Sequence, residues 1–130
     1  PKLNYKMIKY TIEFPIKSSV SVLFNAVSTP DGLSEWFADN VNWNGNVYTF
    51  IWDDSKEEAE LLKKTNNQLI RFRWLHEDED TFFEFKIEVD PVTNDVTLFV
   101  TDFAENEEER ENETKLWEAQ VHALMKRIGS

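Results

Sequence analysis

One carboxylate of this chain, Asp102, occupies a position where it could do chemistry. It follows Val96, Leu98 and Val100 at alternating positions of a predicted strand, residues 96–104. Because successive side chains of a strand point to opposite faces, this spacing turns Asp102 toward the interior together with them. A buried carboxylate needs a partner, or its pKa rises. An inward Asp102 could orient a polar ligand or act as a general base.

A second interpretation of Asp102 is purely structural. The strand could bulge or end near Thr101, so that the carboxylate caps a backbone group or meets Arg71, Arg73 or solvent. We favour this interpretation, because a carboxylate without a His, Tyr or Lys partner in view is weak evidence for catalysis.

The other titratable clusters give weaker signals. The acidic turn His76-Glu77-Asp78-Glu79-Asp80 lacks the Gly-centred ligand spacing of a calcium loop. The acidic run over residues 105–113 is typical of a solvated helix start, and His122 falls beside the apolar stripe of its helix rather than within it. The sequence therefore predicts no metal site, no cofactor and no catalytic residue.

The overall composition narrows the class of partner. The 130 residues carry a net charge of −11, and their Lys and Arg residues are scattered. Nucleic acid and anionic membrane surfaces would repel such a chain. It contains no cysteine, no apolar run long enough to span a bilayer and no signal-peptide pattern. We expect one domain, residues 1–130, in the cytoplasm.

The first 40 residues predict one strand and two short helices. Residues 6–16 alternate apolar and polar side chains, which indicates a half-buried strand. A helix capped by Ser18 or Ser19 follows, with apolar residues at the i, i+3, i+4 and i+7 positions. Thr29-Pro30 then starts a second helix, because a hydroxyl cap followed by Pro favours a first turn. This helix carries Leu33, Trp36 and Phe37.

The remainder predicts an antiparallel meander and a long helix. Short polar turns separate five strands, at residues 46–53, 57–65, 69–76, 81–89 and 96–104. The helix covers roughly residues 107–128 and has an apolar stripe of Leu116, Trp117, Val121, Leu124, Met125 and Ile128. About 20 helical residues extend roughly 30 Å, enough to cross a sheet. The fold class is α+β, a curved antiparallel sheet of about six strands wrapped on the long C-terminal helix.

This order of elements, with these residues, resembles the START-like superfamily of helix-grip proteins, also called SRPBCC. The similarity is greatest to its branch of heat-shock ATPase activator homologues. Residues 20–30 match that branch's V-x-x-x-a-x-T-x-P helix, and Gly32-Leu33-Ser34-Glu35-Trp36-Phe37 matches its x-x-L-x-x-W-F segment. The runs STPDGLSEWFAD, VTDFAE and LWEAQVHAL also look like the small stand-alone START-like proteins of Bacteroidetes.

The resemblance implies where a ligand would bind. In helix-grip folds the second short helix closes one end of the space between the sheet and the long helix. By that analogy, inward side chains could line a ligand cavity: Trp36, Phe37, Trp52, Phe72, Trp74, Phe83, Phe85, Asp102, Trp117 and Val121. The alternative is that the rings fill this space, and we favour filling because protein interiors pack near crystal density.

The resemblance also sets the order of the candidate functions. We expect non-catalytic binding of a small hydrophobic or amphipathic ligand, with apolar burial supplying affinity and one or two polar groups orienting the molecule. A protein-interaction module, linked to a chaperone by family analogy, is the alternative. A cyclase- or aromatase-like enzyme comes third, since the several polar groups that typically line a polyketide cyclase cavity are not found here.

Overall fold

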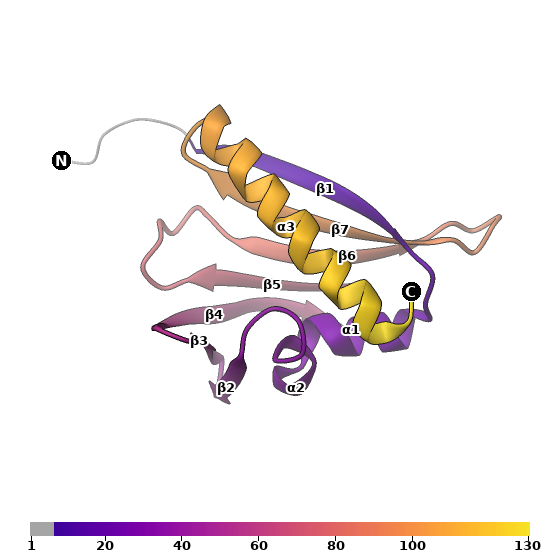
Figure 1. Ribbon diagram of the computed structural model, residues 1–130, viewed down its shortest axis with the longest axis horizontal. Coiled ribbons are helices and arrows are strands. Elements are labelled where there is room, and N and C mark those ends of the chain that lie inside the picture. Colours follow the sequence, from indigo (N-terminus) through magenta and orange to yellow (C-terminus); the bar gives the residue numbers. More distant parts are fainter. Residues whose placement is uncertain (1–6) are drawn as a thin grey trace.

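One seven-stranded antiparallel sheet forms the frame of the molecule. The computed structural model describes residues 7–130, so residue 6, the first of the predicted strand 6–16, lies outside the described residues. The strands are β1 (Ile8–Ile16), β2 (Asn40–Asn44), β3 (Val47–Trp52), β4 (Ser55–Thr65), β5 (Leu69–Trp74), β6 (Phe83–Val89) and β7 (Val96–Ala104). Their order is β1-β7-β6-β5-β4-β3-β2, so the first two strands of the chain, β1 and β2, form the two edges (Figure 1).

Two short helices connect β1 to β2 and carry the predicted caps. Helix α1 (Val20–Ser28) begins after Ser19, whose Oγ accepts the Val22 N–H at 3.2 Å. Helix α2 (Pro30–Leu33) begins after Thr29, whose hydroxyl oxygen accepts the Gly32 N–H at 2.9 Å. Gly32 is needed because a Cβ there would collide with the carbonyl oxygen of Asn25 in α1. The α+β class is confirmed, and so are both short helices.

The second helix is shorter than predicted. It ends at Leu33, and Trp36 and Phe37 lie in the turn that follows. The Phe37 N–H still donates to the Leu33 carbonyl at 2.9 Å, so one further helical turn directs both rings into the core. The predicted inward position of the two rings is confirmed.

The prediction of about six strands missed β2. Its sequence, Asn-Val-Asn-Trp-Asn, contains three Asn residues, which are depleted in strands. Gly45, at φ 61°, supplies the positive φ that a tight two-residue hairpin needs between Asn44 and Val47. Pairing with β3 therefore imposes strand structure on a segment whose own preference is for a loop.

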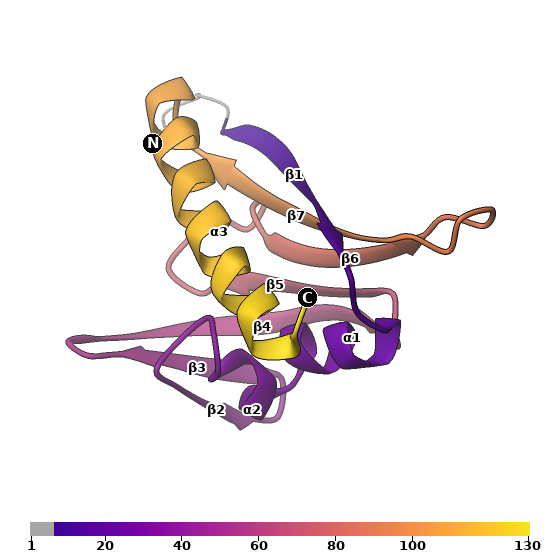
Figure 2. The ribbon, with the colours of Figure 1, turned by 45° about the vertical axis from the view of Figure 1, so that its right-hand side comes forward.

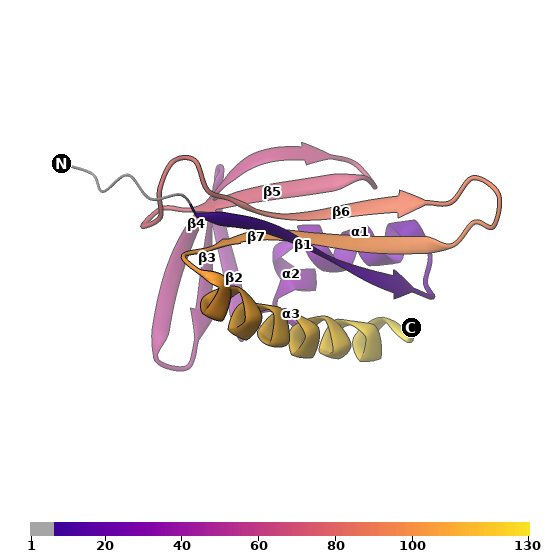
Figure 3. The same cartoon turned by 90° about the horizontal axis from the view of Figure 1, so that it is seen from above.

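The long helix α3 (Glu107–Ile128) lies across one face of the sheet (Figures 2 and 3). Asn106 caps its start, three Glu residues occupy its first turn, and Gly129 ends it at φ 76°. Trp117, Val121 and Leu124 are buried, but Leu116, predicted to lie in the apolar stripe, is 60% exposed. Successive residues of a helix are rotated by about 100°, so Leu116 falls on the solvent side although the next residue, Trp117, is buried. Among the described residues, no helix is long and apolar enough to cross a membrane.

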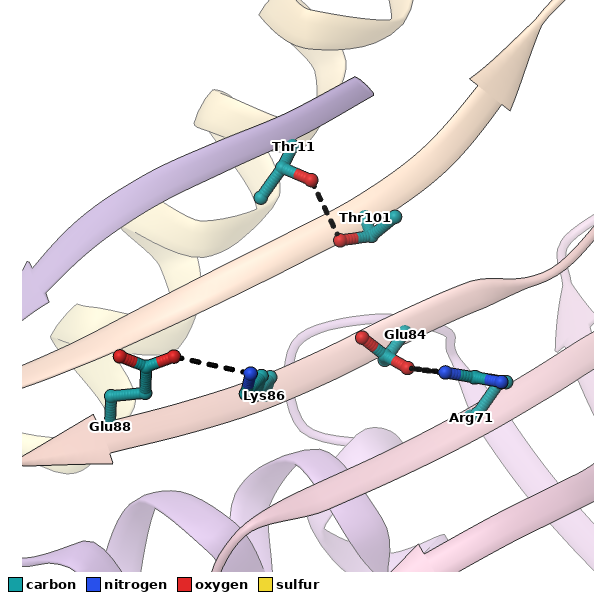
Figure 4. A network of polar contacts seen from close by, with 6 residues as sticks. All are labelled: Thr11, Arg71, Glu84, Lys86, Glu88 and Thr101. Carbon is teal, nitrogen blue, oxygen red and sulfur yellow. Dashed lines mark hydrogen bonds and ion pairs between the residues drawn. The ribbon is translucent and has the colours of Figure 1, made fainter. Parts of the chain in front are cut away.

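The opposite face of the sheet carries polar pairs (Figure 4). Arg71 on β5 binds Glu84 on β6 at 2.7 Å, and its guanidinium lies 4.3 Å from the centre of the Phe82 ring. Thr11 and Thr101 share a hydrogen bond of 2.9 Å between β1 and β7. This face is polar in character, and the buried aromatic side chains lie on the helix side.

Phe37 is the centre of the core on the helix side. Its ring centroid lies 5.2–6.5 Å from those of seven other rings: Trp36, Phe50, Trp52, Trp74, Phe83, Phe85 and Trp117. Offset-stacked and edge-to-face pairs at such separations are favourable beyond the area they bury. A turn residue thus joins β3, β5, β6 and α3.

Replacing Phe37 tests this central position. We expect Phe37→Ala to lower the free energy of unfolding by about 3–5 kcal/mol, because the surrounding rings cannot fully close the space left. The matched control is Trp43→Ala on β2, whose ring is 62% exposed and should cost less than about 1 kcal/mol. Equal, small losses for both variants in chemical denaturation would contradict the packing described.

Candidate functional site

The predicted ligand-binding residues lie together on the helix side of the sheet. Seven of the ten are buried: Trp36, Phe37, Phe72, Phe83, Phe85, Trp117 and Val121. Trp52, Trp74 and Asp102 are half-buried. The aromatic members pack ring against ring, and the Trp74 and Phe83 centroids are 4.7 Å apart. The structure therefore brings the predicted set together as a packed cluster of rings.

Two indole N–H groups in this cluster bind backbone carbonyls. Trp36 Nε1 donates to the Ala26 carbonyl of α1 at 2.8 Å, and Trp52 Nε1 donates to the Phe37 carbonyl at 3.0 Å. Each bond satisfies a polar group that would otherwise be costly to bury. These two tryptophans thus hold the segment after α2 against the sheet.

A third indole of the cluster, that of Trp117, binds a carboxylate. Trp117 Nε1 on α3 donates to Asp102 Oδ2 at 3.1 Å, and the Phe103 N–H donates to Asp102 Oδ1 at 2.8 Å. Strand β7 pairs with β1 without a break from Val96 to Ala104, so it neither bulges nor ends near Thr101. The side chain of Asp102 faces inward, as the alternation predicts.

The interpretation of Asp102 that we favoured from the sequence is therefore wrong in its main part. The carboxylate does accept a backbone N–H, but its side-chain partner is Trp117 rather than an arginine. Arg71 binds Glu84, and Arg73 lies 3.5 Å from Glu60, both on the opposite face of the sheet. Strand pairing decides the outcome, because a regular ladder fixes which face each residue occupies.

A second acidic group lies beside Asp102. Tyr10 on β1 is directly opposite Asp102 on β7, and its hydroxyl donates to Glu113 Oε1 on α3 at 2.6 Å. Glu113 is one helical turn before Trp117, so α3 presents both a carboxylate and an indole to the sheet. Four side chains from three elements therefore form one polar seam: Tyr10, Asp102, Glu113 and Trp117.

A pocket opens at this seam. It has a volume of about 200 Å³ and is lined by Met7, Trp74, Glu77, Thr81, Phe82, Asp102, Phe103, Glu105, Glu109 and Glu113. Trp74 and Asp102 belong to the predicted site, and Trp74 also contacts the ring cluster around Phe37. The pocket is thus the point where the aromatic core meets acidic groups and solvent.

Burial changes the proton affinity of the seam. It raises the pKa of the Asp102 carboxyl to about 7, an effect opposed by the hydrogen bonds from Phe103 and Trp117 and increased by the charges of Glu113 and Glu77. Burial also raises the pKa of Glu113, although its bond from Tyr10 acts in the opposite direction. The pKa of the Tyr10 hydroxyl is raised by its burial and by its bond to Glu113. Between pH 4 and pH 7 the seam therefore keeps a proton that an exposed carboxyl group would release.

Sequence reasoning missed Tyr10, Glu113 and the pocket walls Glu77, Thr81 and Phe82. The alternation of β1 placed Tyr10 inward, but its position opposite Asp102 requires the β1–β7 register. The spacing of Glu113 and Trp117 was a usable signal, because residues four apart share one helix face. His122 is exposed, as predicted. Among the described residues, no three His, Asp or Glu side chains form a group that could hold a metal ion.

Comparisons with known proteins agree with this architecture. A family model described as a START-like superfamily domain matches residues 5–130. A solution NMR structure of a protein from Bacteroides fragilis is 32% identical, with a TM-score of 0.68, and the match covers 95% of this chain and 92% of that one. A search of curated proteins finds no match.

Two more distant structures share the fold. The Aha1 dimer from Colwellia psychrerythraea is 18% identical over 94% of this chain and 96% of that one, with a TM-score of 0.76. A protein of the dynemicin biosynthetic locus is 16% identical over 94% of this chain and 47% of that one, with a TM-score of 0.78. At these identities the similarity concerns the fold alone.

The raised pKa of Asp102 predicts an unusual pH dependence of stability. A carboxyl whose pKa is about 7 when folded and about 3.9 when unfolded favours folding most below pH 4. That contribution is lost as the pH rises to 7, and on the order of 4 kcal/mol separates the two limits. We therefore expect the free energy of unfolding of Asp102→Asn, relative to that of the unsubstituted protein, to increase as the pH rises from 4 to 7. Urea unfolding at several pH values measures this difference.

Asp90→Asn is the control for this experiment. The N–H groups of Thr93 and Val92 lower the pKa of the Asp90 carboxyl, so its contribution is present at neutral pH and lost as the pH falls through its folded pKa. The Asp90 variant should therefore show the opposite sign. Parallel stability curves for Asp102→Asn and the unsubstituted protein would show that Asp102 is not a buried, protonated group.

Proposed function

The chain belongs to the START-like superfamily, whose members typically bind hydrophobic ligands, and on that premise we propose that it binds a small amphipathic molecule without catalysis. The ligand would occupy the pocket at the polar seam, which is lined by residues of α3, of the end of β7 and of the segment between β5 and β6. Its polar end would meet the Asp102 carboxyl, and its apolar end would lie against Trp74 and the ring cluster.

The position of Asp102 carries this proposal. Each of its oxygens accepts one protein N–H, from Phe103 and from Trp117. A carboxylate can accept about four hydrogen bonds, so it retains the capacity to bind a donor on a ligand. Because Asp102 and Glu113 both line the pocket, the polar end of the ligand should donate hydrogen bonds.

Trp74 supplies the apolar part of the site. Its ring system stacks on Phe83, and the residue also lines the pocket. The volume of about 200 Å³ is below the roughly 300–1,000 Å³ typical of sites for drug-sized molecules. The ligand is therefore small, or its apolar tail enters by displacing rings of the cluster, in which Phe37 stacks on Trp117 at 5.7 Å.

A protein-interaction role is the second candidate, and a separate observation supports it. The Trp43 side chain on the edge strand β2 is 62% exposed, far from the pocket-lining residues in the order of the sheet. Exposed tryptophan is enriched at protein interfaces. This surface and the pocket can be tested independently, because they share no residue.

Native mass spectrometry of the protein as purified from cells tests ligand binding. We expect a retained small molecule that is released on denaturation, and Nile red, a neutral apolar dye, should bind the emptied protein. Trp74→Ala should weaken dye binding at least about tenfold, because the lost apolar contact is worth roughly 1.5–3 kcal/mol.

Trp43→Ala is the matched control, since it removes the same side chain from outside the pocket. It should leave dye affinity unchanged. Asp102→Asn should reduce retention of the natural ligand more than binding of the dye, which carries no hydrogen-bond donor. A mass equal to that of the protein alone, together with no dye binding, would contradict the proposal. The remaining interpretation would be that side chains fill the space between the sheet and α3.

A further inference from the structure

An uncharged segment forms one edge of the sheet. Residues 40–52 contain no Asp, Glu, Lys or Arg, although 30% of the chain is charged and Asp39, Asp53 and Asp54 flank the segment. These residues form the β2–β3 hairpin, and β2 is the last strand of the sheet (Figure 1). The edge strand β2 and its partner β3 thus carry no charged side chain, and the nearest acidic residues lie at the two ends of the hairpin.

Strand β2 lacks the charges, prolines and bulges that commonly protect an edge, although α2 packs against it. Natural edge strands carry charges, Pro or bulges that prevent pairing with another chain. Strand β2 has no charge and no Pro, and its pairing with β3 is regular from Asn40 to Asn44. Trp43 is 62% exposed, whereas Val41 is 6% exposed. An unprotected strand with an exposed tryptophan has the features of a pairing surface.

We propose that β2 pairs antiparallel with β2 of a second copy of this chain, about a two-fold axis at Asn42. The sequence Asn-Val-Asn-Trp-Asn is nearly symmetric about its centre. Antiparallel pairing centred on Asn42 places Val41 of one copy opposite Trp43 of the other, and Asn40 opposite Asn44. One surface then serves both copies, as a two-fold interface requires.

The side chains fit this register on both faces of the sheet. Val41 and Trp43 pair with Phe50 and Tyr48 on β3, and both of those residues are buried on the helix side. Each Trp43 would therefore lie on that side next to the Val41 of the other copy, and the surface buried there would come mainly from Trp43 itself, since Val41 is already buried. The three Asn side chains, all exposed, would form a polar ladder on the opposite side.

The backbone fits as well. In a two-residue hairpin the residues flanking the turn, Asn44 and Val47, form a hydrogen-bonded pair, and such pairs alternate along an antiparallel ladder. The backbone groups of Val41 and Trp43 then point toward the open edge. The Val41 N–H is occupied by the side-chain oxygen of Asn40 at 3.0 Å, a bond that a second strand would replace.

Electrostatics and size set the strength of this dimer. Each copy carries a charge of −11, so the copies repel one another at long range and salt should favour pairing by screening. Five paired residues a side form a smaller contact than the roughly 1,200–2,000 Å² of stable complexes. We therefore expect a reversible dimer that is promoted by salt and by concentration.

A single-cysteine variant tests the register directly. The chain contains no cysteine, so Asn42→Cys has a single thiol. In the proposed dimer this thiol lies across the two-fold axis from the same thiol of the second copy. The Cα atoms of such a non-hydrogen-bonded pair lie about 4.5 Å apart, within the range of about 4.4–6.8 Å that a disulfide accepts. Mild oxidation should convert most of the variant to a disulfide dimer. Val92→Cys, at an exposed turn residue, should yield much less dimer under the same conditions.

Charge complementation is the second test. Sedimentation of the unsubstituted protein between about 10 µM and about 1 mM should show a dimer at the upper end. Asn42→Lys and Asn42→Glu should each be monomeric, because like charges would face each other at the axis. Their mixture should recover a heterodimer. Both variants alter an exposed side chain and should fold, which circular dichroism checks.

Three results would overturn the proposal. One is a protein that stays monomeric at the highest concentration in high salt, with no excess of disulfide from Asn42→Cys over Val92→Cys. Another is a dimer that Asn42→Lys does not weaken, since its interface would lie elsewhere. The third is a monomer whose β2 resonances shift only with an added extended peptide, since the edge would then serve another protein.

Discussion

The side chain of Trp117 joins the apolar and polar halves of the interface between α3 and the sheet. Its ring stacks on Phe37 with an angle of 10° between the planes and meets Phe85 edge-on. Its N–H binds Asp102 on β7. Because the ring and the N–H are fixed to each other, any shift of α3 that improves one contact disturbs the other. This double constraint sets where α3 lies, and with it the walls of the pocket.

The polar half of this interface works against stability. Burial places Asp102 beside Glu113 where no lining residue of the pocket is basic, so the negative charge of either one disfavours that of the other. An Asn at position 102 could still accept the hydrogen bond from Trp117 and would carry no charge beside Glu113. Titratable groups that lie in a cleft, have a shifted pKa and reduce the stability of the fold are often functional. Binding of the proposed ligand would account for a carboxyl group at a buried position where it lowers the stability of the fold.

Residue patterns predicted most of the frame and little of the site. The strands β1 and β5 to β7 and the helix α3 follow from periodicity, since burial on one face requires apolar residues at matching intervals. Strand β2 could not be predicted in this way, because its three Asn residues adopt strand structure only through pairing with β3. The resemblance to a known family supplied the topology. The opposition of Tyr10 and Asp102 and the contact of Glu113 with Tyr10 depend on register and helix placement, which no local pattern contains.

The most direct test is an NMR titration that follows the side-chain carboxyl carbon of Asp102 and the indole N–H of Trp117 together. A buried carboxyl held by the indole should titrate with a midpoint near 7, and the Trp117 signal should move with the same midpoint, because deprotonation strengthens the hydrogen bond between the two groups. A midpoint near the ordinary value of 3.8, with a Trp117 signal that does not change, would mean that Asp102 faces solvent and that the pocket lacks its polar anchor.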